Sequence, residues 1–252
     1  MSPDAPLAGS LAVVTGARGR LGPIWTRALE DAGATVVGVD LEAGEGVEQA
    51  DVTDREALER VRDRVIERHG APAVLVNAAG IDQPPEDSAT TFRIEDVPTA
   101  GFRRTVDVNL TGTFVATQVF GAPMRDAGRG SIVNIGSLYA SIAPDPSFYD
   151  HLEVDPPFLK PAAYGASKAG VLHLTRYFAR LWGPRGVRVN ALSPGGVAGG
   201  QDEEFLRKYC ARVPLRRMAE ADDLVGPLVF LATDASRYLT GHELRLDGGF
   251  TA

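Results

Sequence analysis

Short β-branched segments alternate along the chain with amphipathic segments of helix length, and this alternation constrains the fold more than any other feature. The expected strands are residues 11–15, 35–40, 47–51, 73–77, 131–135, 187–192 and 243–246. The expected helices are residues 21–32, 54–69, 102–125, 162–182 and 221–232. Because such alternation implies right-handed crossovers, we expect an α/β fold: a doubly wound parallel sheet of about seven strands with helices on both faces.

Two irregular stretches interrupt this rhythm, but neither has the composition of a linker, so we expect residues 1–252 to form a single domain. Residues 140–161 contain five prolines, and residues 193–202 are dominated by glycine. Long loops in a compact domain are usually functional, and in a doubly wound fold ligands bind beyond the carboxyl ends of the strands. We therefore expect a substrate insertion at 140–161 and a substrate lid at about 195–212.

Composition and charge exclude several classes of protein. The net charge of −7 gives an acidic surface that repels phosphate backbones, so we expect no nucleic-acid partner. The apolar runs are far shorter than the roughly 20 residues of a membrane-spanning helix, and the chain begins without a secretory signal, which together predict a cytoplasmic protein without a membrane partner. Cys210 is the single cysteine, so we expect no intramolecular disulfide, no thiolate zinc site and no bound metal.

The segment 11–22 runs from an expected strand through a glycine-rich turn into an expected helix. Gly16 permits a tight turn, Gly19 lets the backbone approach a pyrophosphate, and Gly22 allows close packing of helix and strand. The free N–H groups at the helix start, around Leu21, would then face the phosphates. This context predicts a dinucleotide-binding site, with an ordinary glycine-rich connection as the alternative.

Acidic residues follow the second and third expected strands. Asp40 lies about 20 residues beyond the glycine turn, where a carboxylate accepts hydrogen bonds from the adenosine ribose and repels a 2′-phosphate, which favours NAD over NADP. Arg18 favours NADP if its guanidinium faces that ribose, although a solvated surface arginine is the simpler interpretation. Asp51 and Val52 are placed to hold the adenine edge, or Asp51 is an ordinary residue of the helix entry, with Thr53 as the expected cap.

Tyr164 and Lys168 are four residues apart within an expected helix, so they share one face. A phenol titrates near pH 10, too high for a base at neutral pH, but a neighbouring ammonium stabilises the phenolate. Ser137 follows an expected strand and supplies a hydroxyl that can hold a substrate oxygen. The tyrosine–lysine pair alone is more often an ordinary surface pair, so its interpretation depends on the remaining motifs.

The motifs taken together resemble the short-chain dehydrogenase/reductase family across nearly the entire chain. The matching pieces are Thr15-Gly16-x-x-Gly19-x-x-Gly22, Asp40, Asp51-Val52, Asn77-Ala78-Ala79-Gly80, Asn109 in Val-Asn-Leu-Thr-Gly, Ser137 in Asn-Ile-Gly-Ser, Tyr164-x-x-x-Lys168, Pro194-Gly195 and Asp247-Gly248-Gly249. The resemblance implies a Rossmann-type fold and a homotetramer or homodimer assembled through the 162–182 helix.

The resemblance also implies roles for individual residues. Tyr164 would be the general acid/base and Ser137 would position the substrate oxygen. Lys168 would bind the nicotinamide ribose and lower the tyrosine pKa, while Asn109 would anchor a water that links Lys168 to solvent. Other positions would bind the cofactor: Asn77, Ala78, Ala79 and Gly80 would flank the adenosine ribose, and the backbone around Pro194, Gly195 and Val197 would receive the carboxamide.

The sequence departs from the family pattern in three places. Arg20 stands where the single-domain branch usually has glycine, and the placement of Gly19 resembles the extended branch, whose C-terminal substrate domain has no room here. The gap between Ser137 and Tyr164 is about twice the family's usual one, with the surplus in 140–161. Gly199 stands where the family often has threonine, which removes one expected cofactor contact.

These observations predict an NAD-dependent oxidoreductase that transfers a hydride between nicotinamide and a secondary alcohol or ketone. The polar residues of the insertion suit a sugar-like or polyol substrate, since buried sugar hydroxyls need partners. A narrower resemblance links the chain to flagellin-modification and nonulosonate-pathway enzymes and to sugar-alcohol dehydrogenases. The alternatives are a nucleotide-sugar epimerase or dehydratase that retains NAD, and a non-catalytic dinucleotide sensor.

Overall fold

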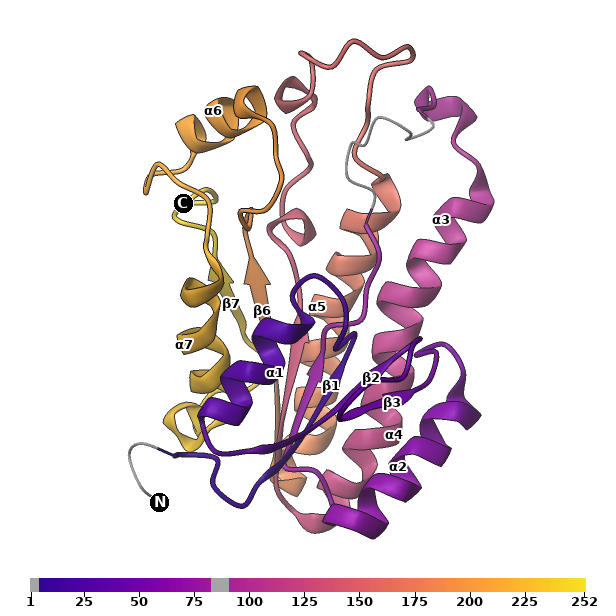
Figure 1. Cartoon of the computed structure of the whole chain (residues 1–252), viewed down its shortest axis with the longest axis vertical. Helices are drawn as coiled ribbons and strands as arrows, with labels where there is room; N and C mark the ends of the chain where they lie inside the picture. Colours follow the sequence, from indigo (N-terminus) through magenta and orange to yellow (C-terminus); the bar gives the residue numbers. More distant parts are fainter. Residues whose placement is uncertain (1–4, 83–90) are drawn as a thin grey trace.

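The computed structural model describes residues 5–82 and 91–252, and seven strands of that part form one parallel sheet (Figure 1). The strands are β1 (Leu11–Thr15), β2 (Thr35–Asp40), β3 (Val47–Gln49), β4 (Val74–Asn77), β5 (Gly130–Ile135), β6 (Val187–Pro194) and β7 (Glu243–Leu246). Their order across the sheet is β3-β2-β1-β4-β5-β6-β7. The predicted strands and the α/β fold class are confirmed.

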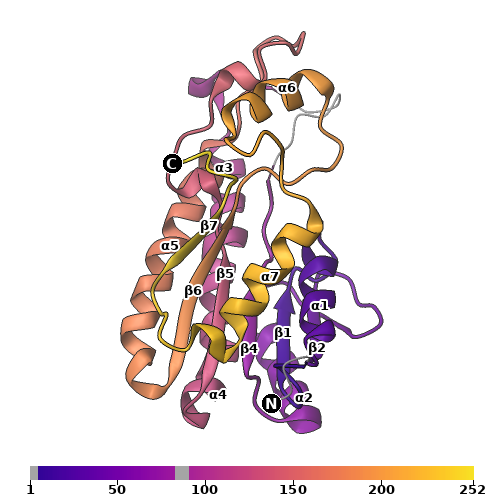
Figure 2. The same ribbon diagram turned by 90° about the vertical axis from the view of Figure 1, so that its left-hand side faces the viewer.

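Helices cover both faces of the sheet, so the strands lie between two apolar layers (Figure 2). The helices are α1 (Gly22–Asp31), α2 (Arg55–His69), α3 (Thr99–Val106), α4 (Gly112–Ala127), α5 (Ala162–Trp182), α6 (Glu203–Arg212) and α7 (Ala221–Ala232). The face covered by α1 and α7 fully buries Trp25, Leu224 and Leu228. The face covered by α2, α4 and α5 fully buries Leu58 and Phe120. None of the helices in the described part is long and apolar enough to cross a membrane.

Two local predictions are corrected by the structure. The expected helix at 102–125 begins earlier and contains a π-helical turn, Asp107–Thr111, between α3 and α4. This wider turn carries Asn109, which is fully buried. The cap of α2 is Asp54 and not Thr53, because the Asp54 carboxylate accepts from the N–H of Ala57 at 3.0 Å, whereas the Thr53 hydroxyl donates back to Asp51.

The parallel pairing brings the carboxyl ends of all seven strands to one edge of the sheet. Thr15 at the end of β1 pairs with Val39 of β2 on one side and with Asn77 of β4 on the other. After β1 the chain adds β2 and β3 on one side of it, and then returns to add β4 on the other side. Ligands of open α/β sheets bind in the crevice at such a switch point.

Above this edge, a third apolar cluster joins the 140–161 insertion to α6, a helix absent from the sequence-based prediction (Figure 1). Phe148 is 1% exposed and lies 6.0 Å from the ring of Phe205, 5.7 Å from Tyr209 and 6.2 Å from Phe250, between ring centroids. Asp202 caps α6 by accepting from the N–H of Phe205. Edge-on and tilted aromatic contacts at these distances are attractive, so the insertion and α6 form one packed unit.

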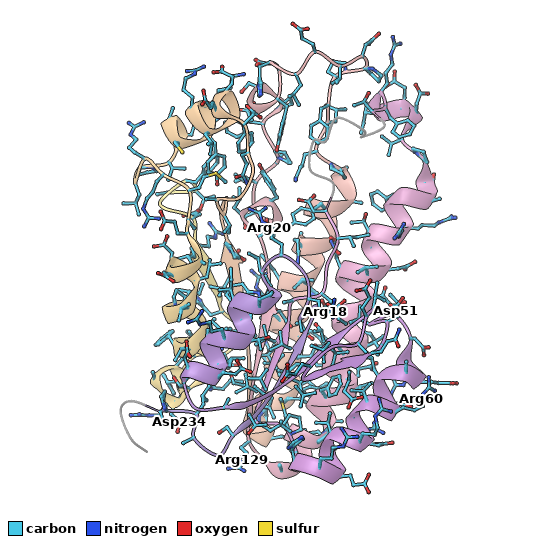
Figure 3. The ribbon with its side chains drawn as sticks, in the orientation of Figure 1. Arg18, Arg20, Asp51, Arg60, Arg129 and Asp234 are labelled. Carbon is cyan, nitrogen blue, oxygen red and sulfur yellow. The ribbon has the colours of Figure 1, made fainter. Side chains whose placement is uncertain are left out.

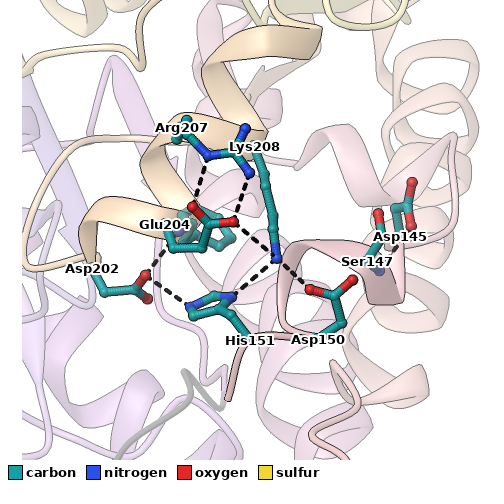
Figure 4. Close-up of polar contacts among 9 residues, drawn as sticks. Asp145, Ser147, Asp150, His151, Asp202, Glu204, Arg207 and Lys208 are labelled. Carbon is teal, nitrogen blue, oxygen red and sulfur yellow. Dashed lines mark hydrogen bonds and ion pairs between the residues drawn. The ribbon is translucent and has the colours of Figure 1, made fainter.

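An ion network on the surface of that unit makes the same connection (Figure 4). Lys208 of α6 pairs with Asp150 of the insertion, and its Nζ lies 3.3 Å from Nδ1 of His151 and 3.5 Å from the Glu204 carboxylate. Nε2 of His151 lies 2.8 Å from the carboxylate of Asp202. Exposed ion pairs contribute little individually, so the rings underneath supply most of the packing energy.

Replacing Phe148 with alanine is expected to loosen the insertion and α6 together, because both pack on this ring. Truncating a buried phenylalanine costs about 3–5 kcal/mol. Hydrogen exchange should show faster exchange in residues 146–161 and in α6, with β1 and β4 unchanged. The matched control is F230A, since Phe230 is 39% exposed on α7. Unchanged exchange in α6 of the F148A variant would contradict the shared packing.

Candidate active site

A cavity of about 1150 Å³ follows the carboxyl ends of the strands. Figure 3 shows Arg18, Arg20 and Asp51 near the middle of the molecule, and Arg129 and Asp234 near its lower end. The predicted site residues that line the cavity are Gly16, Arg18, Gly19, Leu21, Asp40, Asp51, Val52, Ala78, Ala79, Gly80, Ser137, Tyr164, Lys168, Pro194, Gly195 and Val197. Asn77 and Asn109 do not line it and lie behind its wall.

The glycine turn forms the floor of one half of the cavity. Gly16 has φ +68°, and a Cβ there would lie 2.6 Å from Cα of Ala79. A Cβ on Gly22 would lie 2.3 Å from the carbonyl oxygen of Gly16, so both positions require glycine. α1 begins without a side-chain cap, and within the described residues the N–H groups of Arg20 and Leu21 donate to no acceptor. These free donors and the helix dipole suit a phosphate, so the turn fits the pyrophosphate of a dinucleotide.

Asp40 lies next to this turn at the end of β2. Its two carboxylate oxygens accept from the backbone N–H of Arg18 at 2.8 Å and of Leu41 at 2.7 Å. The Arg18 guanidinium donates to the carbonyl of Ala43 at 2.9 Å and lies 3.3 Å from the carboxylate of Glu42. Arg18 is therefore neither freely solvated nor directed at an empty anion site, because its charge is already paired.

Asp51 and Val52 close the same end of the cavity. The Asp51 carboxylate accepts from the backbone N–H of Thr53 at 2.8 Å and from its hydroxyl at 2.7 Å. Val52 packs against the start of α4, where a Cβ on Gly112 would lie 2.6 Å from a Val52 methyl group. Asp51 is thus both a helix-entry residue and a residue of the cavity wall, so the two interpretations of the sequence are compatible.

Asn77 has a structural position instead of a cavity position. Its side-chain amide donates to the hydroxyl of Thr117 at 2.9 Å and to the Asn134 side chain at 2.8 Å, all buried behind the strand ends. The loop after it is held by the Thr15 hydroxyl, which accepts from the N–H groups of Ala78 and Ala79 at 3.2 Å each. Of the Asn77-Ala78-Ala79-Gly80 motif, therefore, only the last three residues line the cavity.

Tyr164 and Ser137 meet at the other half of the cavity. Tyr164 lies in the first turn of α5, and Ser137 follows β5 and accepts from the N–H of Tyr139 at 3.2 Å. Burial raises the pKa of Tyr164 to about 12, and the negative charge of Asp82 acts in the same direction. A hydrogen bond between the phenol and the Ser137 hydroxyl lowers that pKa, but by less. The phenol is therefore protonated at neutral pH in this structure.

Lys168 is buried one helical turn beyond Tyr164, and its Nζ donates to the carbonyl of Ile135 at 2.7 Å. Burial lowers the pKa of Lys168 to about 8, whereas Asp82 acts to raise it. Nζ lies 5.8 Å from the centroid of the Tyr164 ring. In this structure burial dominates the pKa of Tyr164, and Nζ of Lys168 is directed to a carbonyl, so the expected lowering of that pKa by the ammonium stays a prediction.

Asn109 supports this cluster from the π-helical turn. Its side-chain oxygen accepts from the N–H of Ile81 at 2.7 Å, and its amide donates to the Ile81 carbonyl at 3.0 Å and the Ser167 hydroxyl at 3.2 Å. A Cβ on Gly80 would lie 3.3 Å from the Asn109 side-chain oxygen and 3.6 Å from Nζ of Lys168. Asn109 therefore holds the loop that passes beside Lys168, and its expected water-binding role stays a prediction.

The wall beyond Tyr164 contains Tyr149 and Lys160 of the insertion, whose polar residues the sequence assigned to the substrate, together with Asp82, Tyr139 and Tyr209, which sequence reasoning missed. Asp82 and Lys160 form an ion pair of 2.5 Å, and Nζ of Lys160 lies 5.7 Å from the centroid of the Tyr164 ring. The Tyr209 hydroxyl accepts from the N–H of Gly196 at 2.6 Å. Tyr139 and Tyr149 also line the cavity, and the hydroxyl groups of these two residues are hydrogen-bonded to each other. The nearest signal in the sequence was the position of Tyr139, two residues after Ser137.

Comparisons with known proteins agree with this geometry. The family model described as enoyl-(acyl carrier protein) reductase matches residues 24–251. D-threitol dehydrogenase of Mycolicibacterium smegmatis is 33% identical over 272 residues, which cover 98% of this chain and 95% of that protein. A short chain dehydrogenase from Leptospira borgpetersenii with bound NAD+ superposes with a TM-score of 0.87 at 32% identity, over 100% of this chain and 96% of that chain.

A more distant solved structure has a different dinucleotide. A gluconate 5-dehydrogenase from Burkholderia cenocepacia, in complex with NADP and tartrate, superposes with a TM-score of 0.83 at 27% identity, over 98% of this chain and 97% of that chain. These two neighbours therefore both contain a nicotinamide dinucleotide, NAD+ in one and NADP in the other. From the family model, the full-length similarity and the shared fold, the chain belongs to the short-chain dehydrogenase/reductase family of oxidoreductases.

Proposed function

We propose that this protein is an NAD-dependent dehydrogenase that interconverts a secondary alcohol and a ketone of a polyol or similar sugar-like substrate. One observation carries this proposal: Tyr164, Ser137 and Lys168 line the same cavity as the uncapped start of α1. Proton-transfer groups and a pyrophosphate site thus share one crevice, as hydride transfer to a dinucleotide requires.

Tyr164 and Ser137 supply the proton chemistry. A nicotinamide dinucleotide bound in this cavity would supply the hydride chemistry between the alcohol and the ketone. In reduction, the protonated phenol of Tyr164 donates its proton to the substrate oxygen; in oxidation, the phenolate removes it. The Ser137 hydroxyl, which is hydrogen-bonded to the phenol of Tyr164, holds the substrate oxygen beside that phenol. Lys168 would bind the nicotinamide ribose and, as a buried cation, favour the phenolate during oxidation.

The adenosine end of the cavity favours NAD over NADP. Asp40 and Glu42 place two carboxylates there, and the guanidinium of Arg18 is already paired with Glu42 and the Ala43 carbonyl. A 2′-phosphate would meet these two negative charges, and the guanidinium beside them is already paired. Both hydroxyls of an unphosphorylated ribose can instead donate to the Asp40 carboxylate.

The substrate end of the cavity favours a molecule with several hydroxyl groups. Tyr139, Tyr149 and Tyr209 place phenolic hydroxyls in its wall, and the Asp82–Lys160 ion pair adds a charged donor and acceptor. A buried hydroxyl of the substrate needs a partner for each donor and acceptor, which this wall supplies. The insertion and α6, joined by their aromatic cluster, would form the substrate-binding cover.

The assembly we expect is a homotetramer or homodimer through α5. Tyr177 and Leu181 are 56% and 53% exposed on the outer face of this helix. Large apolar side chains that remain exposed on a helix are typical of subunit contacts.

The proposed function is tested by measuring NADH release from NAD+ over polyols, sugars, sugar acids and hydroxysteroids. Stoichiometric NADH with a polyol is the expected outcome. Epimerised product without net NADH would indicate the NAD-retaining alternative, and binding of NAD without any turnover would indicate a sensor.

The Y164F variant is expected to lose turnover by about 10²–10⁴-fold, because the ring remains and only the transferable proton is removed. NAD+ affinity, measured by calorimetry, should change little, since the phenol contributes no charge at neutral pH. Y238F serves as the control, because Tyr238 is fully exposed and lies outside both the cavity and the proposed subunit contact. A Y164F enzyme that retains more than a few per cent of its rate would remove Tyr164 from the acid/base role.

The D40A variant is expected to lose its preference for NAD by roughly 10–100-fold, the equivalent of about 1.5–3 kcal/mol for hydrogen bonds to a charged group. The measurement is the ratio of kcat/KM with NAD+ to that with NADP+. The matched control is E45Q, which removes a nearby charge from an exposed residue that does not line the cavity. An unchanged ratio in D40A would disprove the assignment of Asp40 to the ribose.

Alcohol oxidation should speed up with rising pH, because the pKa of Tyr164 is about 12 and oxidation uses the phenolate. The D82N variant is expected to move this alkaline rise to lower pH, since the Asp82 charge raises the pKa of Tyr164. The measurement is kcat/KM for oxidation against pH, with E42Q as a control of equal charge change. A D82N profile that does not move, or moves to higher pH, would contradict this electrostatic coupling.

A further inference from the structure

Arg20 extends across the mouth of the cavity. It precedes α1 in the glycine turn, yet its Nη2 donates to the carbonyl of Val197, beyond the end of β6, at 2.7 Å. Figure 3 shows Arg20 at the carboxyl end of the sheet, and both residues line the cavity. One side chain thus links the floor of the dinucleotide site to the segment that begins the lid.

Gly199 leaves the space that this guanidinium occupies. A Cβ at position 199 would lie 2.6 Å from Nη2 and 3.3 Å from Cζ of Arg20. A side chain here would therefore displace the guanidinium from the Val197 carbonyl. Two departures noted in the sequence, arginine at 20 and glycine at 199, are thus one spatial feature.

The charge of Arg20 is not neutralised by a neighbouring carboxylate. Over residues 5–82 and 91–252 no ion pair involves Arg20, whereas Arg18 in the same turn is paired with Glu42. Lys168, another cation that lines the cavity, is buried and directed to the carbonyl of Ile135. Arg20 therefore brings an unneutralised positive charge to the glycine turn.

The donors around Arg20 have room for an anion. A guanidinium has five N–H donors, and among the described residues the hydrogen bond to Val197 uses one of them and leaves the others available. The backbone N–H groups of Arg20 and Leu21 donate to no acceptor in the described residues. Together with the positive end of α1, these groups surround the position where a pyrophosphate binds in this fold.

We propose that Arg20 binds the diphosphate of the nicotinamide dinucleotide, with the Val197 carbonyl and the space at Gly199 positioning its guanidinium. The inference rests on the proposed dinucleotide-dependent function and adds a residue to the cofactor site. Guanidinium–phosphate hydrogen bonds are charge-assisted and geometrically specific, so this one side chain can contribute a large part of the affinity. Because the same side chain holds Val197, diphosphate binding also couples to the position of the lid.

The test is calorimetric binding of NAD+, ADP-ribose and adenosine to the wild type and the R20A variant, with no turnover needed. Affinity for NAD+ and ADP-ribose should fall about tenfold or more, and affinity for adenosine, which has no phosphate, should stay within about twofold. The wild-type affinity for ADP-ribose should weaken with added salt, and this dependence should be smaller in R20A. The matched control is R27A, which removes an equal charge from the outer face of α1, where Arg27 is 83% exposed.

The role of Gly199 is tested by the double-mutant cycle of R20A and G199A. In the wild-type background, G199A should weaken ADP-ribose binding about as much as R20A does, because it displaces the guanidinium. In the R20A background, G199A should add little further loss, since there is no guanidinium to displace. Any backbone strain from alanine at φ +155° is present in both backgrounds and cancels in the cycle.

Several outcomes would overturn the inference. Equal losses for ADP-ribose and adenosine in R20A would mean that Arg20 only supports the loop, and unchanged affinities would mean that it does not touch the diphosphate. Additive effects of R20A and G199A would remove the positioning role of Gly199. If the wild type binds no dinucleotide at all, the proposed function fails, whereas wild-type binding with an unaffected R20A variant overturns only the role of Arg20.

Discussion

The site depends on the close approach of the β1–α1 turn to the loop that follows β4. A Cβ at position 16 would meet the backbone of Ala79 at 2.6 Å, so only glycine lets these two strand ends come together. The Thr15 hydroxyl then bonds the N–H groups of Ala78 and Ala79, which fastens the loop to the end of β1. This contact positions the start of α1, with its free N–H groups, beside the loop that passes close to Lys168 and Asn109.

The catalytic half of the cavity balances two buried groups whose pKa values move in opposite directions. Burial favours the neutral form of each, which raises the pKa of Tyr164 to about 12 and lowers that of Lys168 to about 8. Asp82 opposes the phenolate but supports the ammonium. Tyr164 is thus protonated and can donate its proton to a substrate oxygen. A positively charged group bound beside it would favour the phenolate, which takes a proton from the alcohol.

Much of the fold and the dinucleotide half of the site could be predicted from the sequence, because both depend on local patterns. The strands show apolar β-branched runs, and the glycine turn and Asp40 follow them at fixed intervals. The side-chain positions of Asn77 and Asn109 could not be predicted, because their partners Thr117 and Ser167 are distant in sequence. The cap at Asp54 is local, but the adjacent Thr53 has a hydroxyl that could cap equally well and that the structure directs to Asp51 instead. The high pKa of Tyr164 was missed for a similar reason, since burial depends on the whole packed structure.

The substrate wall shows why irregular segments gave the weakest predictions. Residues 140–161 have no periodicity, yet Phe148, Tyr149 and Phe158 are buried there against Phe205 and Tyr209 of α6. Aromatic rings can fill such a unit without regular spacing, since each packs edge-on or tilted against several others. The wall is therefore held mainly by its own rings and surface ions, while the regular sheet below holds the dinucleotide turn and Tyr164. Asp82 and Lys160 connect the two parts, because Nζ of Lys160 lies 5.7 Å from the centroid of the Tyr164 ring and the charge of Asp82 raises the pKa of that tyrosine. Changes at these two positions are therefore expected to affect proton transfer as well as the substrate wall.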